Sequence, residues 1–135
     1  LQVRWHGSGN SPKIENNVVT EFGFLTNRVT DISPLRALTG LKAVWCGGFP
    51  DDPSRRGQLT DLSPLRGMSL NSAILMYNRN LSDLSPLHGM PLTHLDVRRT
   101  KVVDLKPLRG MPLKHLDLGT TPVSDLSPLE GMSLT

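Results

Sequence analysis

Residues 82–132 read SDLSPLHGMPLTHLDVRRTKVVDLKPLRGMPLKHLDLGTTPVSDLSPLEGM, and the same short phrase returns in this stretch every 21 residues. Related phrases occur nearer the N-terminus. The copies are TDISPL (30–35), TDLSPL (60–65), SDLSPL (82–87), VDLKPL (103–108) and SDLSPL (124–129). Self-similarity at a fixed short period predicts a solenoid, in which each repeat forms one coil and buries its apolar face against the neighbouring coils.

The segments between these phrases carry a second pattern. Residues 92–102 follow L-x-x-L-x-V-x-x-T-x-V and residues 113–123 follow L-x-x-L-x-L-x-x-T-x-V. This is the spacing of a leucine-rich repeat, with Thr where Asn or Cys is commoner. Alternation predicts a short strand that points Leu95 and Val97 inward. The same spacing fits Val19, Phe22, Phe24, Asn27 and Val29, and then Leu41, Val44, Cys46 and Phe49.

The D-x-S-P-L phrase predicts the return segment of each coil. Ser85 suits a helix N-cap with Pro86 at the first helical position, and Gly89 suits a left-handed stop one turn later. Only a brief 3₁₀ or α turn fits between them. Lys106 replaces the Ser in one repeat and should weaken that cap. We expect the recurring Asp residues to accept backbone N–H bonds at a corner, in preference to acting as ligands. They are Asp31, Asp61, Asp83, Asp104 and Asp125.

Two repeats are irregular. Residues 47–58 (GGFPDDPSRRGQ) contain most of nine extra residues and should form a protruding loop after their strand. Residues 70–81 contain one extra residue and fit the repeat in two ways. We prefer the alignment that turns Leu70, Ala73, Leu75 and Asn78 inward, because it keeps Asn at its usual corner; the alternative turns Ile74 and Met76 inward.

The sequence predicts a covered sheet edge at the N-terminal end of the solenoid and an exposed sheet edge at the C-terminal end. Residues 13–20 (KIENNVVT) indicate an antiparallel hairpin around Asn16-Asn17, which would cover the open edge of the first coil. The final GMSLT stops where another strand should begin, which leaves an exposed edge and suggests self-association through it. We therefore expect one domain over 1–135, with a cap region at 1–18 and about five repeats over 19–135, the last of them incomplete.

These residues resemble bacterial leucine-rich-repeat arrays built on D-L-S-P-L-x-G-M-P-L, and NVVTEFGFLTNRVTDISPLRAL (17–38) resembles their opening. The resemblance covers roughly residues 13–135. It implies an α/β solenoid: a short horseshoe with a parallel concave sheet, brief 3₁₀ or α turns on the convex side, and the N-terminal β-hairpin cap. Such arrays are often appended to serine/threonine kinase-like domains. The resemblance thus implies an accessory for interaction or sensing, and no kinase signature is present.

Composition excludes several classes of function. Lys and Arg (15) are interspersed with Asp and Glu (12), so nucleic acid is not an expected partner. No stretch reaches the ~20 apolar residues of a membrane span, and LQVRWHGSGN (1–10) lacks a signal-peptide core and a Met start, as in a fragment of a longer protein. The lone Cys46 excludes an internal disulfide. The compartment stays open, with a slight preference for the cytoplasm, and no cofactor is implied.

Outward positions of the strands predict a partner-binding face in two halves. The predicted outward residues of the first coil are Glu21, Gly23, Leu25 and Thr26. The apolar half that follows contains Trp45, Ile74, Met76 and Tyr77. Exposed apolar residues that gather on a concave surface are typical of a partner site. The charged half contains His94, Asp96, Arg98, Arg99, Lys114, His115 and Asp117.

Three functions are consistent with this face. We prefer non-catalytic binding of a protein or peptide by the concave face and the 47–58 loop. The first alternative is a metal-binding or metal-regulated module, because His94, Asp96, His115 and Asp117 could reach a common ion. Arg98, Arg99 and Lys114 count against it, since they can neutralise the carboxylates. The second alternative is a passive spacer. Catalysis is not expected, because Ser residues fall mainly on the opposite side and Cys46 points into the core.

Overall fold

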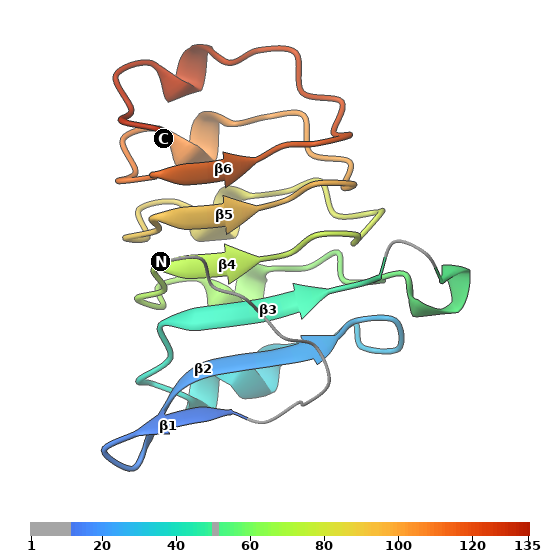
Figure 1. Ribbon diagram of the computed structural model, residues 1–135, viewed down its shortest axis with the longest axis vertical. Coiled ribbons are helices and arrows are strands. Elements are labelled where there is room, and N and C mark those ends of the chain that lie inside the picture. Colours follow the sequence, from blue (N-terminus) through green and yellow to red (C-terminus); the bar gives the residue numbers. More distant parts are fainter. Residues whose placement is uncertain (1–11, 50–51) are drawn as a thin grey trace.

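The computed structural model describes residues 12–49 and 52–135, and these form the predicted solenoid (Figure 1). Each coil has a short strand on one side and a 3₁₀ turn on the other. The strands are β1 (Lys13–Glu15), β2 (Val18–Leu25), β3 (Ala43–Gly47), β4 (Ser72–Ile74), β5 (His94–Asp96) and β6 (His115–Asp117). The 3₁₀ turns are η1 (Ser33–Ala37), η2 (Pro53–Arg55), η3 (Ser63–Leu65), η4 (Ser85–Leu87), η5 (Lys106–Leu108) and η6 (Ser127–Leu129). Residues 1–11 of the predicted cap region and residues 50–51 of the insertion lie outside the described chain.

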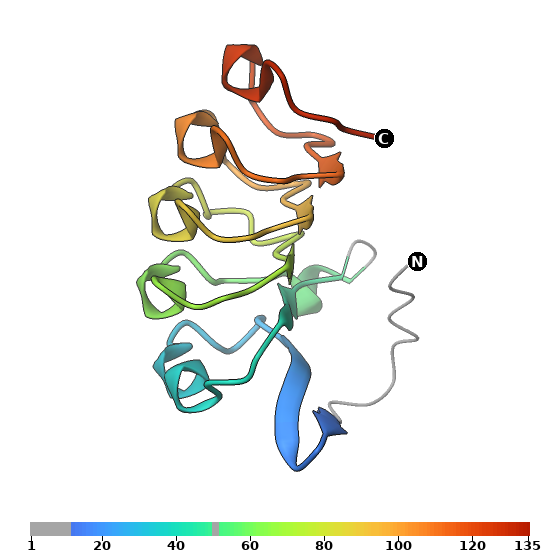
Figure 2. The ribbon, with the colours of Figure 1, turned by 90° about the vertical axis from the view of Figure 1, so that its left-hand side faces the viewer.

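One sheet runs the length of the solenoid in the order β1-β2-β3-β4-β5-β6. Strands β2 to β6 are parallel, and their register pairs equivalent positions of successive repeats, such as His94 with His115 and Asp96 with Asp117. Figure 2 shows the sheet on the concave side and turns η1 and η3 to η6 on the convex side, whereas η2 lies beside the strands. Side chains at one repeat position therefore form columns on the concave face.

The core confirms the preferred alignment of residues 70–81. Leu70, Ala73, Leu75 and Asn78 are each 0% exposed, whereas Ile74 and Met76 are only partly buried and lie on the sheet face. Every parallel coil contributes a leucine or its equivalent to the same apolar stack, and this burial is the main stabilising contribution.

Asn78 links three coils. Its Nδ2 donates to the carbonyl oxygens of Cys46 (2.6 Å) and Leu75 (2.8 Å). Its Oδ1 accepts from the Thr26 hydroxyl (2.7 Å) and from the Leu59 backbone N–H (3.0 Å). All four hydrogen-bonding capacities of the amide are therefore used inside the core. Thr26, which we predicted to point outward, is fully buried in this network.

The recurring Asp residues confirm the predicted corner role. Each accepts the backbone N–H two residues later through Oδ1, at 2.7–2.9 Å, in all five D-x-x-P-L phrases. The predicted Ser cap is wrong in detail. Ser85 is the first residue of η4, and the N-cap position is Leu84, whose side chain cannot accept a hydrogen bond; the N–H of Ser85 donates to Asp83 instead. Turn η5 accordingly forms at Lys106 with the same bounds as its neighbours.

The glycines after the 3₁₀ turns and the N-terminal hairpin agree with the sequence predictions. Gly67, Gly89, Gly110 and Gly131 have φ values of +75° to +77°, the left-handed region, and they follow turns η3, η4, η5 and η6. Asn16 and Asn17 have φ values of 51° and 63°, so they form a tight turn of the kind that joins antiparallel strands. Strand β1 pairs with β2 and covers the first edge of the sheet, as predicted.

The insertion after β3 extends beyond the ends of the neighbouring strands, as predicted, and its last residues return to the solenoid (Figure 1). It contains η2, and Gly57 then forms a parallel bridge with Asn78. The backbone N–H of Gly57 donates to the Tyr77 carbonyl at 3.1 Å, and that of Gln58 donates to the Thr26 carbonyl at 2.9 Å. The segment from η2 to Gly57 thus packs beside the C-terminal ends of the strands. None of the helices in the described chain is long and apolar enough to span a membrane.

Candidate functional site

The floor of the concave face is built around Trp45. Its outward neighbours on the sheet are Gly23 on β2 and Gly47 on β3 itself. A Cβ atom on Gly23 would stand 3.5 Å from Cε3 of the indole, and one on Gly47 would stand 3.5 Å from Cε2. The two glycines therefore leave room for the partly buried indole to lie along the sheet.

Two aromatic residues extend this floor to the edge where the strands end. The Phe49 and Trp45 rings lie 6.1 Å apart, and the Arg55 guanidinium lies 4.5 Å from the Phe49 ring centre. Tyr77 lies one coil further on and Arg99 lies two coils further on. The Arg99 guanidinium is 5.9 Å from the ring centre of Tyr77. Phe49 and Arg55 lie in the 47–58 loop, which we predicted to take part in binding without naming these two residues. Their signal was an aromatic and a basic residue inside an insertion next to the strand that carries Trp45.

The corner after each of the later strands has unusual backbone geometry. Tyr77, Arg99 and Thr120 have φ values of 64°, 55° and 58°, at equivalent positions of three coils. Non-glycine residues adopt this region at a cost of roughly 1 kcal/mol or more each. Gly would fit here without strain, so the large side chains of Tyr77 and Arg99 are retained at an energetic cost at the rim of the concave face.

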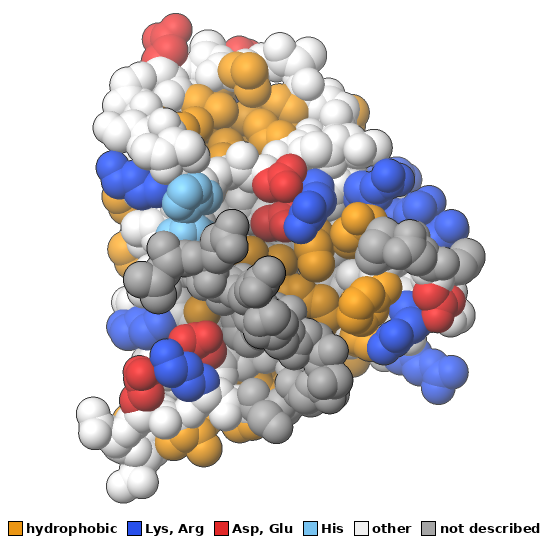
Figure 3. Space-filling view, in the orientation of Figure 1, with side chains coloured by type: hydrophobic (Ala, Val, Ile, Leu, Met, Phe, Trp, Pro, Cys, Tyr) orange, Lys and Arg blue, Asp and Glu red, His pale blue; other side chains and the backbone are white. Residues whose placement is uncertain are grey.

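Arg98 organises the charged half of the face. Its guanidinium lies 2.9 Å from an Asp96 carboxylate oxygen and 3.5 Å from one of Asp117. It also donates to the Met76 sulfur at 3.3 Å, which ties the charged half to the apolar half. Asp96 is 7% exposed, and burial raises its pKa while the Arg98 backbone N–H and guanidinium oppose that shift. Figure 3 shows acidic and basic side chains next to one another on this face.

His94 and His115 lie next to each other at the first positions of β5 and β6, on the same face of the sheet as Asp96 and Asp117. Their ring centres lie 4.5 Å apart. Nδ1 of His94 lies 2.9 Å from the Thr93 hydroxyl, while Nε2 of His94 is buried without a hydrogen-bond partner in the described chain. Burial lowers the pKa of His94, and the charge of His115 adds to the effect. A hydroxyl therefore meets an outward His, which the sequence did not lead us to expect; Thr93 also contacts the Asn71 carbonyl at 3.1 Å.

Acidification should destabilise the fold through His94. The unfolded chain protonates this residue near its ordinary pKa of 6.5, whereas the folded chain resists, so the stabilisation is present above that value and is lost as pH falls through the lower folded pKa. We expect the melting temperature to fall between about pH 7.5 and about pH 5.5. His94→Gln should flatten this slope, and His88→Gln, on the convex side, should not; equal slopes in all three proteins would contradict the assignment to His94.

The four predicted metal-ligand residues do not converge. Asp96 and Asp117 both pair with Arg98, whereas the rings of His94 and His115 contact each other. In residues 12–49 and 52–135, no group of three or more His, Cys, Asp or Glu side chains is arranged to hold a metal ion. A depression of about 200 Å³ does open between them. Its lining is Ile74, His94, Leu95, Asp96, His115, Leu116, Asp117 and Thr135.

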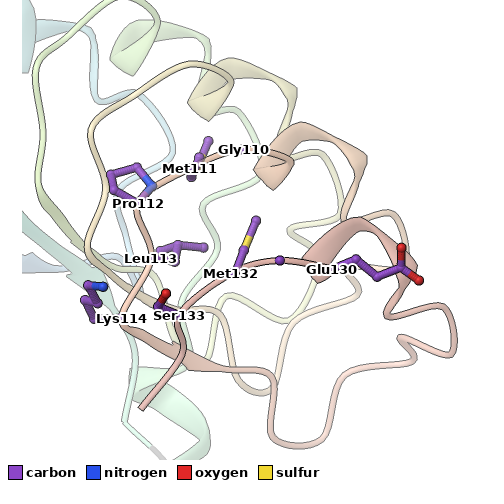
Figure 4. A pocket seen from close by; sticks show the side chains of 9 residues that line it. Gly110, Met111, Pro112, Leu113, Lys114, Glu130, Met132 and Ser133 are labelled. Carbon is purple, nitrogen blue, oxygen red and sulfur yellow. The ribbon is translucent and has the colours of Figure 1, made fainter.

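A second hollow, of about 210 Å³, lies away from this face, between the chain that leaves η5 and the chain that leaves η6 (Figure 4). Residues 110–114 form one wall and residues 130–133 the other. Met111 and Met132 point into the space between successive coils, and Lys114 and Glu130 stand at its margins. Nothing in this lining resembles a catalytic constellation.

Solved structures resemble the chain, although no protein-family model and no curated protein sequence matches it. The internalin inlF from Listeria monocytogenes superimposes with a TM-score of 0.68 and 37% sequence identity over 78% of the chain. Internalin C2 from the same organism gives a TM-score of 0.73 and 29% identity over 86% of the chain. The chain spans only 30% and 49% of these two proteins, respectively. Together with the register of the sheet, they show that the chain is a short leucine-rich-repeat solenoid.

Proposed function

We propose that the chain is a non-catalytic module that binds a protein or peptide on its concave face, as the interaction arm of a larger protein. The observation that carries the proposal is the placement of Trp45, half-buried on a glycine-lined floor. Ile74 and Met76 continue the apolar surface on the next strand. Solenoids of this kind use an extended concave face for binding, and Trp and Tyr are frequent hot-spot residues.

The chemistry of the face favours binding over catalysis. Cys46, the one thiol, is fully buried, and burial raises its pKa to about 12, so it is a poor nucleophile. Arg98 forms an ion pair with both Asp96 and Asp117, and neither carboxylate lies beside a nucleophile among the described residues. Attachment to a kinase-like domain stays a prediction from the sequence resemblance, and self-association stays a prediction from the open C-terminal edge of the sheet.

A peptide selection tests the proposal. We expect the chain to enrich specific sequences from a displayed library of random dodecapeptides. The double variant Trp45→Ala/Tyr77→Ala should weaken binding of those peptides by about thirtyfold or more, because truncation of a hot-spot residue costs about 2 kcal/mol or more. Its melting temperature should change little, since both side chains are only partly buried. Fluorescence polarisation of labelled peptides measures the affinity.

The matched control removes apolar surface elsewhere. Val103 and Leu126 are 54% and 56% exposed and lie outside the strands that form the concave face. Val103→Ala/Leu126→Ala should leave peptide affinity unchanged. Failure to enrich any peptide would favour the passive-spacer alternative. Equal binding by wild type and Trp45→Ala/Tyr77→Ala would move the site away from this face.

A further inference from the structure

The edge where the strands end carries a row of cationic side chains, which we name the basic edge. It follows β3, β4 and β5, on consecutive coils. Its members are Arg55, Arg56, Arg79, Arg99 and Lys101. Figure 3 shows Lys and Arg gathered along this side, beyond the ends of the strands. Neighbouring coils are held close by the bridge between Gly57 and Asn78 and by the bond from the Lys101 N–H to the Leu81 carbonyl (2.8 Å).

The basic edge is not neutralised by the described chain. Ion pairs among residues 12–49 and 52–135 involve Lys13, which pairs with Glu15 and Glu21, and Arg98, which pairs with Asp96 and Asp117. None of the basic-edge residues appears in them. The nearby carboxylate of Asp52 accepts from both the backbone N–H and the hydroxyl of Ser54. Asp52 also lies close enough to Arg55 for that charge to help lower the pKa of its carboxyl, so Arg55 is partly offset, whereas the other basic-edge residues form no ion pair among the described residues.

Two arginines of the basic edge are held ready for an anion. Arg55 stacks over Phe49 and Arg99 lies over Tyr77. An arginine on an aromatic face keeps its in-plane N–H donors available, and these match the two oxygens of a carboxylate. Stacking also reduces the side-chain entropy lost on binding. The rings beneath these arginines belong to the same surface as Trp45, so an apolar floor and a cationic rim adjoin.

We propose that the partner of the concave face is an acidic protein segment, in which Asp or Glu residues flank at least one large apolar side chain. This inference rests on the proposed function and adds the chemistry of the ligand. The carboxylates lie on the basic edge while the apolar side chain lies on Trp45, Ile74 and Met76. A protein segment is favoured over a nucleic acid, because aliphatic Ile74 and Met76 require an apolar group to cover them and a phosphate backbone supplies none.

The same dodecapeptide selection tests this assignment. We expect the enriched peptides to contain more Asp and Glu than Lys and Arg, together with a large apolar residue. Arg79→Glu/Lys101→Glu should weaken their binding about tenfold or more, and raising salt from about 50 mM to about 500 mM should also weaken it. The matched control is Arg66→Glu/Arg109→Glu, which makes the same change of charge on the convex side and should alter affinity less than about twofold.

The outcomes separate this inference from the proposed function. Enriched peptides that are neutral or basic, or that bind Arg79→Glu/Lys101→Glu as tightly as wild type, would overturn the acidic partner while leaving the concave site in place. Binding of a twelve-base-pair DNA duplex with equal affinity, lost on the same substitutions, would mark the basic edge as a general polyanion surface and overturn the assignment. Enrichment of no peptide would overturn both proposals.

Discussion

Asn78→Ala should lower the free energy of unfolding by about 3 kcal/mol, the largest effect we expect from a single polar substitution in this chain. The amide makes four hydrogen bonds, and truncation leaves the Thr26 hydroxyl, the Leu59 N–H and the carbonyls of Cys46 and Leu75 without that partner. Each is buried, so water cannot easily replace the lost bonds. Urea denaturation followed by circular dichroism measures the loss.

Thr121→Ala is the matched control. Thr121 occupies the equivalent corner in the last coil, where its hydroxyl makes one hydrogen bond, to the Leu118 carbonyl (2.6 Å). Its loss should cost only about 1 kcal/mol. Comparable losses in the two variants would contradict the view that Asn78 holds three coils together, because position in the repeat alone would then explain the effect.

The repeat spacing sufficed to predict the fold, because each local signal agreed with the same coil. Alternation placed Leu95 and Val97 inward, Gly89 ended a turn, and Asn78 kept its corner despite an extra residue in its repeat. Asn16-Asn17 predicted the hairpin by the same local logic. These features depend on residues close in sequence, so a pattern of one repeat is enough to find them.

Contacts between coils escaped prediction. The repeat frame placed Thr26 on the outer face, but it turns inward because Asn78, 52 residues away, offers an acceptor there. Ser85 resembled an N-cap, yet it is the first residue of the turn, and both its backbone N–H and its hydroxyl donate to Asp83. The sequence also did not indicate whether Arg98 would pair with Asp96 or Asp117. In the structure it lies beside both. Side-chain choices among several nearby partners depend on three-dimensional distances that the spacing does not contain.

The insertion shows the same limit in its backbone. Its length and composition predicted a loop, whereas its return path depends on one glycine. Gly57 sits between Asn78 and Thr26, where a Cβ atom would overlap the Asn78 side-chain oxygen and press on the Thr26 hydroxyl. Only a residue without a side chain lets the loop close over the Asn78 network. The apolar floor at Trp45 and the basic edge meet at this closure.

Gly57→Ala should therefore destabilise the fold by about 2 kcal/mol, although replacing Gly by Ala at a compatible position normally stabilises a protein by about 0.4–1 kcal/mol. Gly57 is not among the residues with positive φ, so the loss would report steric overlap alone. Gly67→Ala is the complementary control. Gly67 has a φ of +77° and no atom within 4 Å of the added group, so this substitution should cost about 1 kcal/mol through backbone strain.

Because Gly57 acts through Asn78, Gly57→Ala/Asn78→Ala should lose less stability than the sum of the single variants in urea denaturation. Additive losses, or a Gly57→Ala protein as stable as wild type, would show that the loop closes without contacting the Asn78 network.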